Sequence, residues 1–256
     1  MTFKEKIESC SAVCGTFVHI SDLMVSEILG SLGYDFAWID MEHTTLSCEQ
    51  VRNHIVALRG AGTPAIVRVP VHDLTNTKRI LEIGPDGIIF PMVHSYEEAE
   101  ELISWTMYPP YGERGCGPKG AVRYGLDSEP DYYANGHKKF CRFIQIETKS
   151  IVDDIEKIAK MPYLDGCILG MHDLSGSIQR LGDIFCEENL ALVMHSIEVL
   201  RANNKTVGVA TFATDNETLE RYHNMGINMI TTGADYEYIR KGGLDTLKLI
   251  REIQKK

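Results

Sequence analysis

Two carboxylates each follow an apolar segment, and a stretch of helix-forming residues separates the two segments. Glu147 ends the segment that begins at Phe143, and Asp173 comes shortly after the segment 164–169. Parallel strands need a helical connection, and residues 150–161 are long enough to form one. In parallel α/β sheets and barrels, active sites lie at the carboxyl ends of the strands. Two carboxylates brought together there predict a site for a divalent cation that prefers oxygen ligands.

Side-chain alternation adds an amide to this site. Successive side chains of a strand point to opposite faces, so Gln145 and Glu147 share one face. A buried carboxylate needs a partner or a metal, and for Glu147 the alternatives are loop amides or an ion pair with Arg68. For Asp173 the alternative is a helix N-cap, a common position for this residue type.

Two basic side chains also lie near the ends of predicted strands. Arg68 interrupts the apolar strand Ala65–Val69, where an unpaired Arg is rare. Its guanidinium can hold a carboxylate through two parallel hydrogen bonds, and the alternative is an internal salt bridge to Asp40 or Glu42. His43 suits a general base because imidazole is largely neutral near pH 7, although it is one of nine histidines.

Eight apolar runs alternate with helix-like segments along the whole chain. Strands of a parallel sheet that is covered on both faces read as continuous apolar runs. The 256 residues match the roughly 250 of a (β/α)8 barrel. We therefore predict an α/β fold, a single (β/α)8 TIM barrel domain over residues 1–256. A doubly wound sheet is the alternative, and no G-x-G-x-x-G fingerprint supports a nucleotide-binding version. The predicted strands are Val13–Ile20, Phe36–Asp40, Ala65–Val69, Gly87–Val93, Phe140–Glu147, Leu164–Leu169, Thr206–Ala210 and Ile227–Thr232.

Several predictions concern the segments between the strands. Ser47 and Gln50 form a capping box at one helix start, and Thr214 caps a later helix. Residues 150–161 are predicted to form one crossover helix, and 108–136 a long irregular loop of the kind that is usually functional or disordered. The helix that begins at Ser21-Asp22 has a predicted apolar face of Leu23, Val25, Ile28, Leu29 and Leu32.

Composition and charge exclude several classes of protein. The net charge of −10, from 26 basic and 36 acidic residues, argues against nucleic acid and anionic membranes as partners. We find no membrane-spanning run and no signal peptide. The seven cysteines show no C-x-x-C pair, so we predict a reducing, cytoplasmic location. Cys48 and Cys167 are poor nucleophile candidates, and we find no P-loop, G-x-S-x-G or H-E-x-x-H motif.

With these residues placed, the sequence resembles the HpcH/HpaI family of class II pyruvate aldolases over nearly its whole length. The family's Asp-Gly-Glu-His, strand-end Arg, Tyr-Pro-Pro-x-Gly-x-Arg-Gly, Gln-Ile-Glu-Thr and Asp-Leu-Ser blocks occur here in order. The matching residues are Asp40 to His43, Arg68 to Pro70, Tyr108 to Gly115, Gln145 to Thr148 and Asp173 to Ser175.

The resemblance implies roles for these positions. Glu147 and Asp173 would ligate Mg²⁺ or Mn²⁺, with Co²⁺ and Zn²⁺ as alternatives. Arg68 and Gln145 would contact the 2-oxo acid, and His43 would be the acid/base. The resemblance also implies a (β/α)8 barrel that assembles into a homo-trimer or hexamer through its C-terminal helix, with active sites that borrow groups from a neighbour.

Three departures from the family pattern concern the same site. Gly170-Met171-His172 stands where the family has Gly-Pro-Ala beside the pyruvate carboxylate, so these residues are predicted to bind substrate in an altered way. Met41 replaces a Gly before the Glu-His pair. Glu82 replaces the Asp that supports the catalytic His from a neighbouring subunit, and Glu82 is predicted to do the same.

The function implied is a metal-dependent carbon–carbon lyase. It would cleave a 4-hydroxy-2-oxo acid or a 2-keto-3-deoxy sugar acid to pyruvate and an aldehyde. The alternatives are a citrate-lyase-like enzyme acting on an acyl-CoA ester and a non-catalytic barrel that binds a 2-oxo acid.

Overall fold

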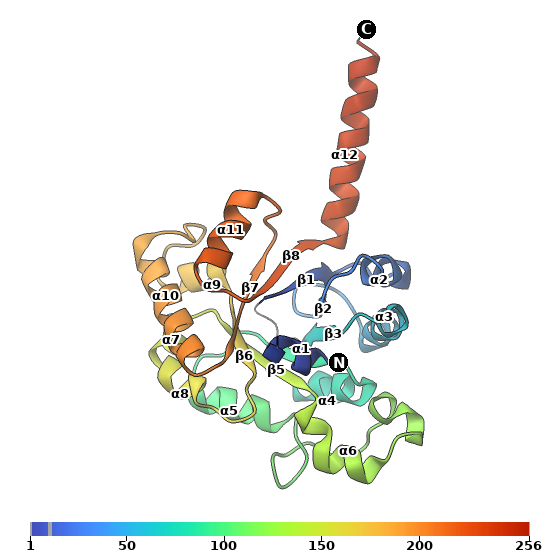
Figure 1. Ribbon diagram of the computed structural model, residues 1–256, viewed down its shortest axis with the longest axis vertical. Coiled ribbons are helices and arrows are strands. Elements are labelled where there is room, and N and C mark those ends of the chain that lie inside the picture. Colours follow the sequence, from blue (N-terminus) through green and yellow to red (C-terminus); the bar gives the residue numbers. More distant parts are fainter. Residues whose placement is uncertain (1, 10–11, 256) are drawn as a thin grey trace.

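Eight parallel strands close into a barrel with helices around its outside (Figure 1). Each strand pairs with the next along the chain, and the last pairs with the first. The computed structural model describes residues 2–9 and 12–255, so Cys10 lies outside the described residues. The predicted barrel is confirmed. Its strands are β1 (Val13–Val18), β2 (Phe36–Asp40), β3 (Ala65–Arg68), β4 (Gly87–Phe90), β5 (Cys141–Ile146), β6 (Gly166–Leu169), β7 (Thr206–Thr211) and β8 (Met229–Ala234).

Most helices lie between successive strands, while α1 precedes β1 and α12 follows β8, and two 3-10 turns lie between β4 and β5. No helix of the described part of the chain has the length and apolar character to cross a membrane. The helices are α1 (Phe3–Ser9), α2 (Leu23–Gly30), α3 (Cys48–Ala61), α4 (Leu74–Ile83), α5 (Tyr96–Ser104), α6 (Glu129–Asn135), α7 (Lys149–Asp153), α8 (Ile155–Ala159), α9 (Met171–Ser177), α10 (Glu187–Ala202), α11 (Asn216–Asn224) and α12 (Asp235–Ile253), with 3-10 turns η1 (Gly120–Gly125) and η2 (Gly136–Lys138).

The barrel interior is filled by side chains that alternate along the strands. Phe17 of β1 lies beside Trp38 of β2, which lies beside Ile66 of β3. These residues belong to one buried cluster inside the barrel, while a second, larger cluster fills the layer between the strands and the helices. At the amino ends of the strands, Phe3 of α1 packs on Phe36 with ring centroids 5.3 Å apart. The interior is therefore closed at the amino end, and polar side chains occupy the carboxyl end.

Helix starts confirm one predicted cap and correct another. Ser47 accepts a hydrogen bond from the Gln50 amide at 3.3 Å, and the Gln50 side chain accepts one from the Ser47 amide at 2.8 Å. The predicted cap at Thr214 is wrong, because Asp215 accepts a hydrogen bond from the Thr218 amide at 2.8 Å and is the N-cap of α11.

Two of the predicted connections are also wrong in detail. The single crossover helix is two helices, α7 and α8, which meet at Asp154. The Asp154 carboxylate accepts a hydrogen bond from the Tyr96 amide at 3.0 Å, so this residue ties the break to the start of α5. The region 108–136 is not wholly irregular, because it contains η1 and all of α6, which Ser128 caps through the Asp131 amide.

The predicted apolar face of α2 is mostly exposed. Ile28 and Leu32 are exposed, whereas Ser26, Leu29 and Gly30 are buried. A Cβ at Gly30 would lie 2.7 Å from the Cβ of Ala61 in α3. Because small residues let α2 and α3 approach closely, the large apolar side chains are left on the outer surface.

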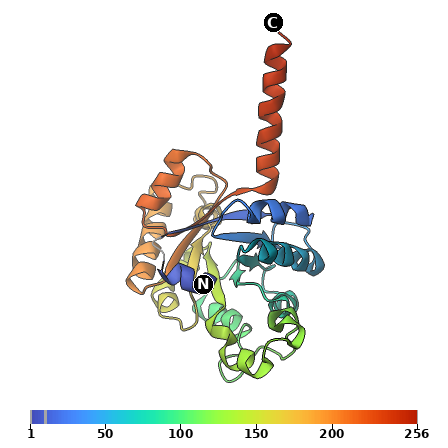
Figure 2. The same cartoon turned by 45° about the vertical axis from the view of Figure 1, so that its right-hand side comes forward.

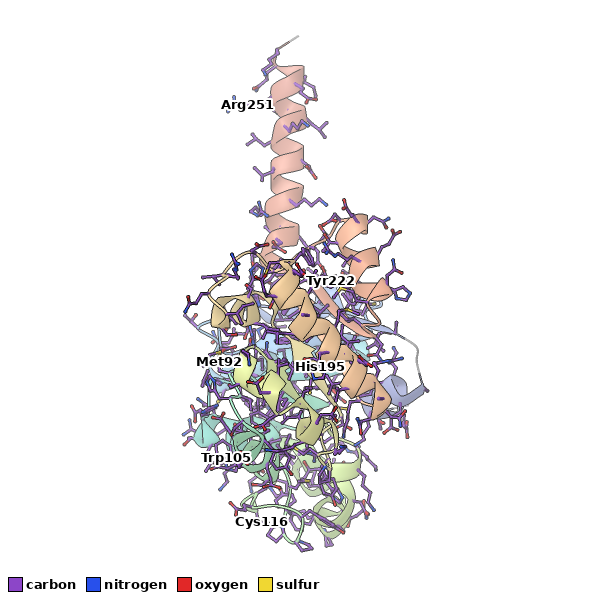
Figure 3. The ribbon with its side chains drawn as sticks, turned by 90° about the vertical axis from the view of Figure 1, so that its left-hand side faces the viewer. Met92, Trp105, Cys116, His195, Tyr222 and Arg251 are labelled. Carbon is purple, nitrogen blue, oxygen red and sulfur yellow. The ribbon has the colours of Figure 1, made fainter. Side chains whose placement is uncertain are left out.

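The C-terminal helix α12 projects away from the barrel (Figures 1 and 2). Arg251, near its end, lies far from the rest of the chain (Figure 3). The base of the helix is fixed by hydroxyl groups, since the Tyr238 hydroxyl lies 3.0 Å from that of Thr16 and 2.9 Å from that of Tyr34. The helix is thus anchored to β1 at one end and uncovered along most of its length.

A pair of glycine substitutions tests the tight spacing of β6 and β7. A Cβ at Gly166 would lie 2.2 Å from the Thr206 carbonyl oxygen, whereas one at Gly60 on the outer face of α3 would meet nothing within 4 Å. We expect Gly166→Ala to lower the free energy of unfolding by about 1–3 kcal/mol, because the two strands must move apart. Gly60→Ala is the matched control and should raise it by about 0.5–1 kcal/mol through helix propensity. Urea titration measures both, and an unchanged midpoint for Gly166→Ala would contradict the spacing.

Candidate active site

A buried ion pair lies at the carboxyl end of the barrel. Asp40 ends β2 and Arg68 ends β3, and the strand register places the two residues side by side. The Arg68 Nε donates to Asp40 Oδ1 at 2.9 Å, and its Nη2 donates to Asp40 Oδ2 at 2.6 Å. Hydrogen bonds of this two-pronged kind are strong and directional. The guanidinium is therefore held in one orientation, as the salt-bridge alternative for Arg68 predicted.

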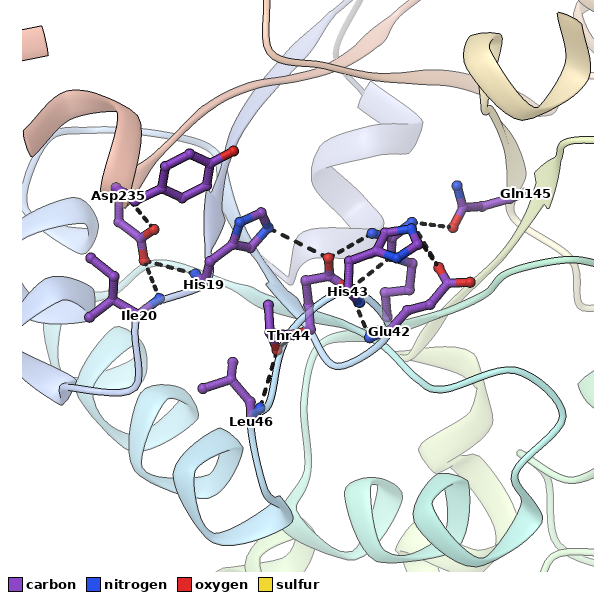
Figure 4. A network of polar contacts seen from close by, with 11 residues as sticks. His19, Ile20, Glu42, His43, Thr44, Leu46, Gln145 and Asp235 are labelled. Atoms are coloured by element: carbon purple, nitrogen blue, oxygen red, sulfur yellow. Dashed lines mark hydrogen bonds and ion pairs between the residues drawn. The ribbon is translucent and has the colours of Figure 1, made fainter. Parts of the chain in front are cut away.

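The remaining nitrogen of Arg68 extends the network across the barrel mouth (Figure 4). Its Nη1 donates to Gln145 Oε1 at 3.1 Å and lies 2.9 Å from Glu42 Oε2. The Gln145 amide in turn donates to Glu147 Oε1 at 2.9 Å. Glu147 Oε2 also accepts a hydrogen bond from the Met92 amide at 2.8 Å, so its loop-amide alternative is observed too. Three predicted site residues, Arg68, Gln145 and Glu147, are thus brought together.

The carboxylates of the mouth carry more negative charge than Arg68 can balance. Burial raises the pKa of Glu147 to about 7, with the charges of Glu42 and Asp173 adding to the effect. Burial also raises the pKa of Glu42 to about 7. The charge of Arg68 lowers this pKa, but the charges of Asp40 and Asp173 raise it and offset part of that effect. Burial opposes the charge of Asp40 as well, but hydrogen bonds from Arg68 hold the pKa of Asp40 below its usual value.

The donor set suits a hard divalent cation. Glu147 and Asp173 act electrostatically on one another across the mouth, and both offer oxygen ligands. Asp173 lies exposed in the first turn of α9 with no hydrogen bond or ion pair to the described residues, so the N-cap alternative is wrong and Gly170 is the N-cap. No cluster of three or more His, Cys, Asp or Glu in residues 2–9 and 12–255 could hold a metal. Magnesium sites of one or two carboxylates, completed by water and substrate, match this set.

The three residues of the segment that departs from the family pattern, Gly170, Met171 and His172, have different surroundings in the structure. A Cβ at Gly170 would lie 2.5 Å from the Cγ of Glu147, so only glycine lets this backbone pass the carboxylate. The Met171 side chain is buried in the core between the barrel and the helices, which leaves only its backbone near the site. His172 is exposed. Of the three, Gly170 is the one that contacts a predicted metal ligand.

Two histidines lie on the β1–β2 side of the mouth. His43 is largely exposed, and its Nε2 lies 3.7 Å from Glu42 Oε2. His19, which the sequence analysis did not select, places its Nε2 3.5 Å from Asp40 Oδ2. Alternation could have identified His19, because it follows the inward-facing Phe17 by two positions.

Glu82 lies apart from this group within one chain. It is near the end of α4, and its Oε1 lies 3.4 Å from the Arg114 Nη2. No hydrogen bond or ion pair joins it to His43 within the described residues. Cys48 and Cys167 remain poor nucleophile candidates, since burial raises the pKa of Cys48 and raises that of Cys167 to about 12.

Comparison with known proteins decides the family. A model of the HpcH/HpaI aldolase/citrate lyase family matches residues 14–241. The chain belongs to this family. The predicted family and the predicted class of enzyme, a carbon–carbon lyase, are therefore confirmed.

Named relatives of this family member cover nearly the whole chain. The hydroxypyruvate/pyruvate aldolase of Roseovarius nubinhibens is 31% identical over 248 residues, which are 96% of this chain and 95% of that protein. The 4-hydroxy-2-oxovalerate aldolase of Novosphingobium aromaticivorans is 31% identical over 254 residues, 98% of this chain and 95% of that protein. A crystal structure of a family protein from Burkholderia cenocepacia is 26% identical with a TM-score of 0.89, covering 97% of this chain and 98% of that one.

Removal of the guanidinium should destabilise this family member in a pH-dependent way. Arg68→Met leaves Asp40 buried without a partner, so we expect a loss of about 3–5 kcal/mol in unfolding free energy at pH 7. The folded pKa of Asp40 is depressed, so the pair's contribution is present above the unfolded pKa, about 4, and is lost as the pH falls through the folded pKa. The difference between wild type and variant should therefore shrink in acid.

Urea titration between pH 3 and 8 measures this difference. Arg180→Met is the control, because Arg180 pairs with Glu188 on the surface and its removal should change little at any pH. A difference for Arg68→Met that stays constant down to pH 3 would contradict the linkage to Asp40.

Proposed function

We propose that the chain is a metal-dependent aldolase that cleaves a 4-hydroxy-2-oxo acid or a 2-keto-3-deoxy sugar acid to pyruvate and an aldehyde. The observation that supports this most is the oriented guanidinium of Arg68 beside carboxylates whose surplus charge needs a cation. The names of the relatives, which include pyruvate and 4-hydroxy-2-oxovalerate aldolases, agree with it.

In this proposal Glu147 and Asp173 hold Mg²⁺ or Mn²⁺. When bound, the cation supplies Lewis acidity at the carboxylate and 2-oxo oxygens of the substrate. The hydrogen bonds from Gln145 and Met92 orient the Glu147 carboxylate toward the mouth before any ligand arrives. Such second partners hold ligand side chains in place in many metal sites.

Arg68 stabilises the charge that develops on the 2-oxo oxygen as the bond breaks. Its Nε and Nη2 are committed to Asp40, so Nη1 is the nitrogen that faces the remaining polar groups. A donor that is already oriented needs no rearrangement during the reaction, which is why such groups lower barriers effectively. Gln145 completes the arrangement by accepting from Arg68 and donating to Glu147.

His43, or a water beside it, removes the proton of the substrate's 4-hydroxyl. The C3–C4 bond then breaks, its electron pair moves to C3 as the pyruvate enolate, and C4 becomes the aldehyde carbon. Protonation of C3 completes pyruvate. The exposed imidazole of His43 lies 3.7 Å from Oε2 of Glu42, and burial raises the pKa of Glu42 to about 7.

A coupled assay tests the proposal. Pyruvate release from several 4-hydroxy-2-oxo acids, followed with lactate dehydrogenase, should require Mg²⁺ or Mn²⁺ and stop with EDTA. Glu147→Gln and Asp173→Asn should each lower kcat/KM by at least about 100-fold, because each removes a charged ligand. Asp153→Asn, which changes an exposed carboxylate paired with Lys149, is the control and should retain activity. Absence of pyruvate from every substrate with metal bound would reject the proposal.

The two alternatives predict different behaviour of pyruvate alone. A barrel that only binds 2-oxo acids would not exchange the methyl protons of pyruvate with deuterium, whereas an aldolase with metal would. An acyl-CoA lyase would release its product from a thioester and leave free 4-hydroxy-2-oxo acids intact.

We also propose that the chain assembles into a homo-oligomer, a trimer or a hexamer, through α12. Exposed apolar side chains form a stripe on this helix from Ile239 to Ile253, in steps of five, three, three and three residues, and α2 presents a similar surface with Met24, Ile28 and Leu32. Contiguous exposed apolar surface of this kind marks interfaces. In such an assembly Glu82 of one subunit would support His43 of another. The α12 residues of this stripe are Ile239, Leu244, Leu247, Ile250 and Ile253.

Charge placed on this stripe should break the assembly. Leu247→Glu with Ile250→Glu should shift the mass measured by light scattering to a smaller species, because two carboxylates would have to be buried. Lys248→Glu, on the same turn of α12, is the matched control and should leave the mass unchanged. An unchanged mass for the double variant, or a wild-type monomer, would contradict the proposed interface.

Two further expectations complete the proposal. We propose that residues 1–256 form one domain, since the closing strand pair joins β1 and β8 from the two ends of the sequence. We also propose a cytoplasmic location, which the six described free cysteines support.

A further inference from the structure

Three aromatic rings from distant parts of the chain meet at the barrel mouth. His19 follows β1, Phe212 follows β7, and Tyr236 is the second residue of α12. The rings of His19 and Tyr236 stack with centroids 5.5 Å apart and 19° between planes. Phe212 lies 6.2 Å from His19 and 6.4 Å from Tyr236. We call these three residues the aromatic wall.

The aromatic wall is continuous with the site at Arg68. Phe17, inside the barrel, lies 5.5 Å from His19 and 5.3 Å from Phe212. Phe17 also lies 5.2 Å from Trp38, and the Arg68 guanidinium lies 5.3 Å from the Trp38 ring. Phe17 and Trp38 therefore connect the aromatic wall to the Arg68 guanidinium.

A buried carboxylate fixes the wall in place. Asp235, the first residue of α12, accepts hydrogen bonds from the His19 amide at 2.7 Å and the Ile20 amide at 2.8 Å (Figure 4). Its other oxygen accepts one from the Tyr236 amide at 2.7 Å. On the far side, His19 Nε2 lies 3.5 Å from Asp40 Oδ2. The wall is therefore held at a set position relative to the Arg68–Asp40 pair.

The chemistry of the wall is apolar and accessible. Phe212 is 50% exposed and Tyr236 is 41% exposed, although large aromatic rings are normally buried. Burial lowers the pKa of His19, more than the nearby carboxylates raise it, so its imidazole is neutral near pH 7. Ala210, two residues before Phe212, occupies an inward position and has a small side chain. Phe212 and Tyr236 are thus partly open to solvent at the barrel mouth.

The charges around the wall disfavour an anionic ligand. Asp40, Glu42 and Asp235 lie on this side, and the Arg68 guanidinium, which contacts Asp40, Glu42 and Gln145, serves the 2-oxo oxygen in the proposed reaction and not the distal group of the aldehyde. The positive charge of Arg240 also interacts with Tyr236. Arg240, however, lies one turn further along the exposed α12 and pairs with Glu237 at 3.9 Å.

We propose that the aromatic wall binds the aldehyde half of the substrate and favours aldehydes with an apolar, planar distal group over those with a carboxylate. The inference rests on the proposed aldolase function. In the synthetic direction, pyruvate loses a methyl proton, its C3 forms a bond to the aldehyde carbon, and the aldehyde oxygen takes a proton to become the 4-hydroxyl. The distal group of the aldehyde packs on Phe212 and Tyr236 during this step.

Two aldehyde substrates, one apolar and one anionic, test the role of the aromatic wall. With Mn²⁺ and pyruvate, we expect kcat/KM for benzaldehyde to exceed that for succinic semialdehyde by about tenfold, the size of one good aromatic contact. In Phe212→Ala, the rate of addition to benzaldehyde divided by the rate of pyruvate methyl-proton exchange should fall about tenfold. Phe212→Trp should restore the quotient. Tyr163→Ala, which removes a partly exposed ring before β6 at the opposite end of the barrel, should leave it at the wild-type value.

Methyl-proton exchange separates the two ways of failing. Wild-type protein that shows no exchange with metal present would overturn the aldolase function and this inference with it. Exchange together with a preference for succinic semialdehyde would overturn the inference alone. A Phe212→Ala protein that loses exchange and addition in equal proportion would also overturn it, because the ring would then support the fold rather than the acceptor.

Discussion

The paired hydrogen bonds between Arg68 and Asp40 determine the arrangement of the whole barrel mouth. The register of β2 and β3 sets the two residues side by side, and burial makes each depend on the other for its charge. Two nitrogens of the guanidinium are thereby fixed, so the third points toward Gln145 and Glu42. Asp40 also receives the amides of Glu42 and His43, and therefore shapes the loop that presents the acid/base candidate.

The surplus of carboxylates beside one cation links this geometry to the chemistry of the family. Burial raises the pKa values of Glu42 and Glu147 to about 7, and the charges of neighbouring carboxylates add to this effect. In the proposed function, a divalent cation held by Glu147 and Asp173 would offset the negative charge of these carboxylates. The close passage of Gly170 past Glu147 shows that the backbone is shaped around the same carboxylate.

The C-terminal helix relates the outside of the molecule to the mouth. Its first residue, Asp235, holds the His19 loop, and its second, Tyr236, belongs to the aromatic wall. The rest of the helix projects away from the barrel (Figure 2). It exposes apolar side chains that a monomer would leave in water. In the proposed oligomer, packing of this helix on a neighbour would therefore also steady one side of the active site.

The sequence by itself determined the order of the eight strands, the family, and the group Arg68, Gln145 and Glu147, because apolar runs, strand alternation and local motifs are properties of neighbouring residues. It misjudged the break at Asp154, the cap at Asp215 and the outer face of α2, where a distant partner or a close helix contact outweighs local preference. Only the tertiary structure decided that Met171 turns into the core while His19, Phe212 and Tyr236 meet. Such contacts join residues some 200 positions apart through the closure of the barrel, and no local pattern encodes them.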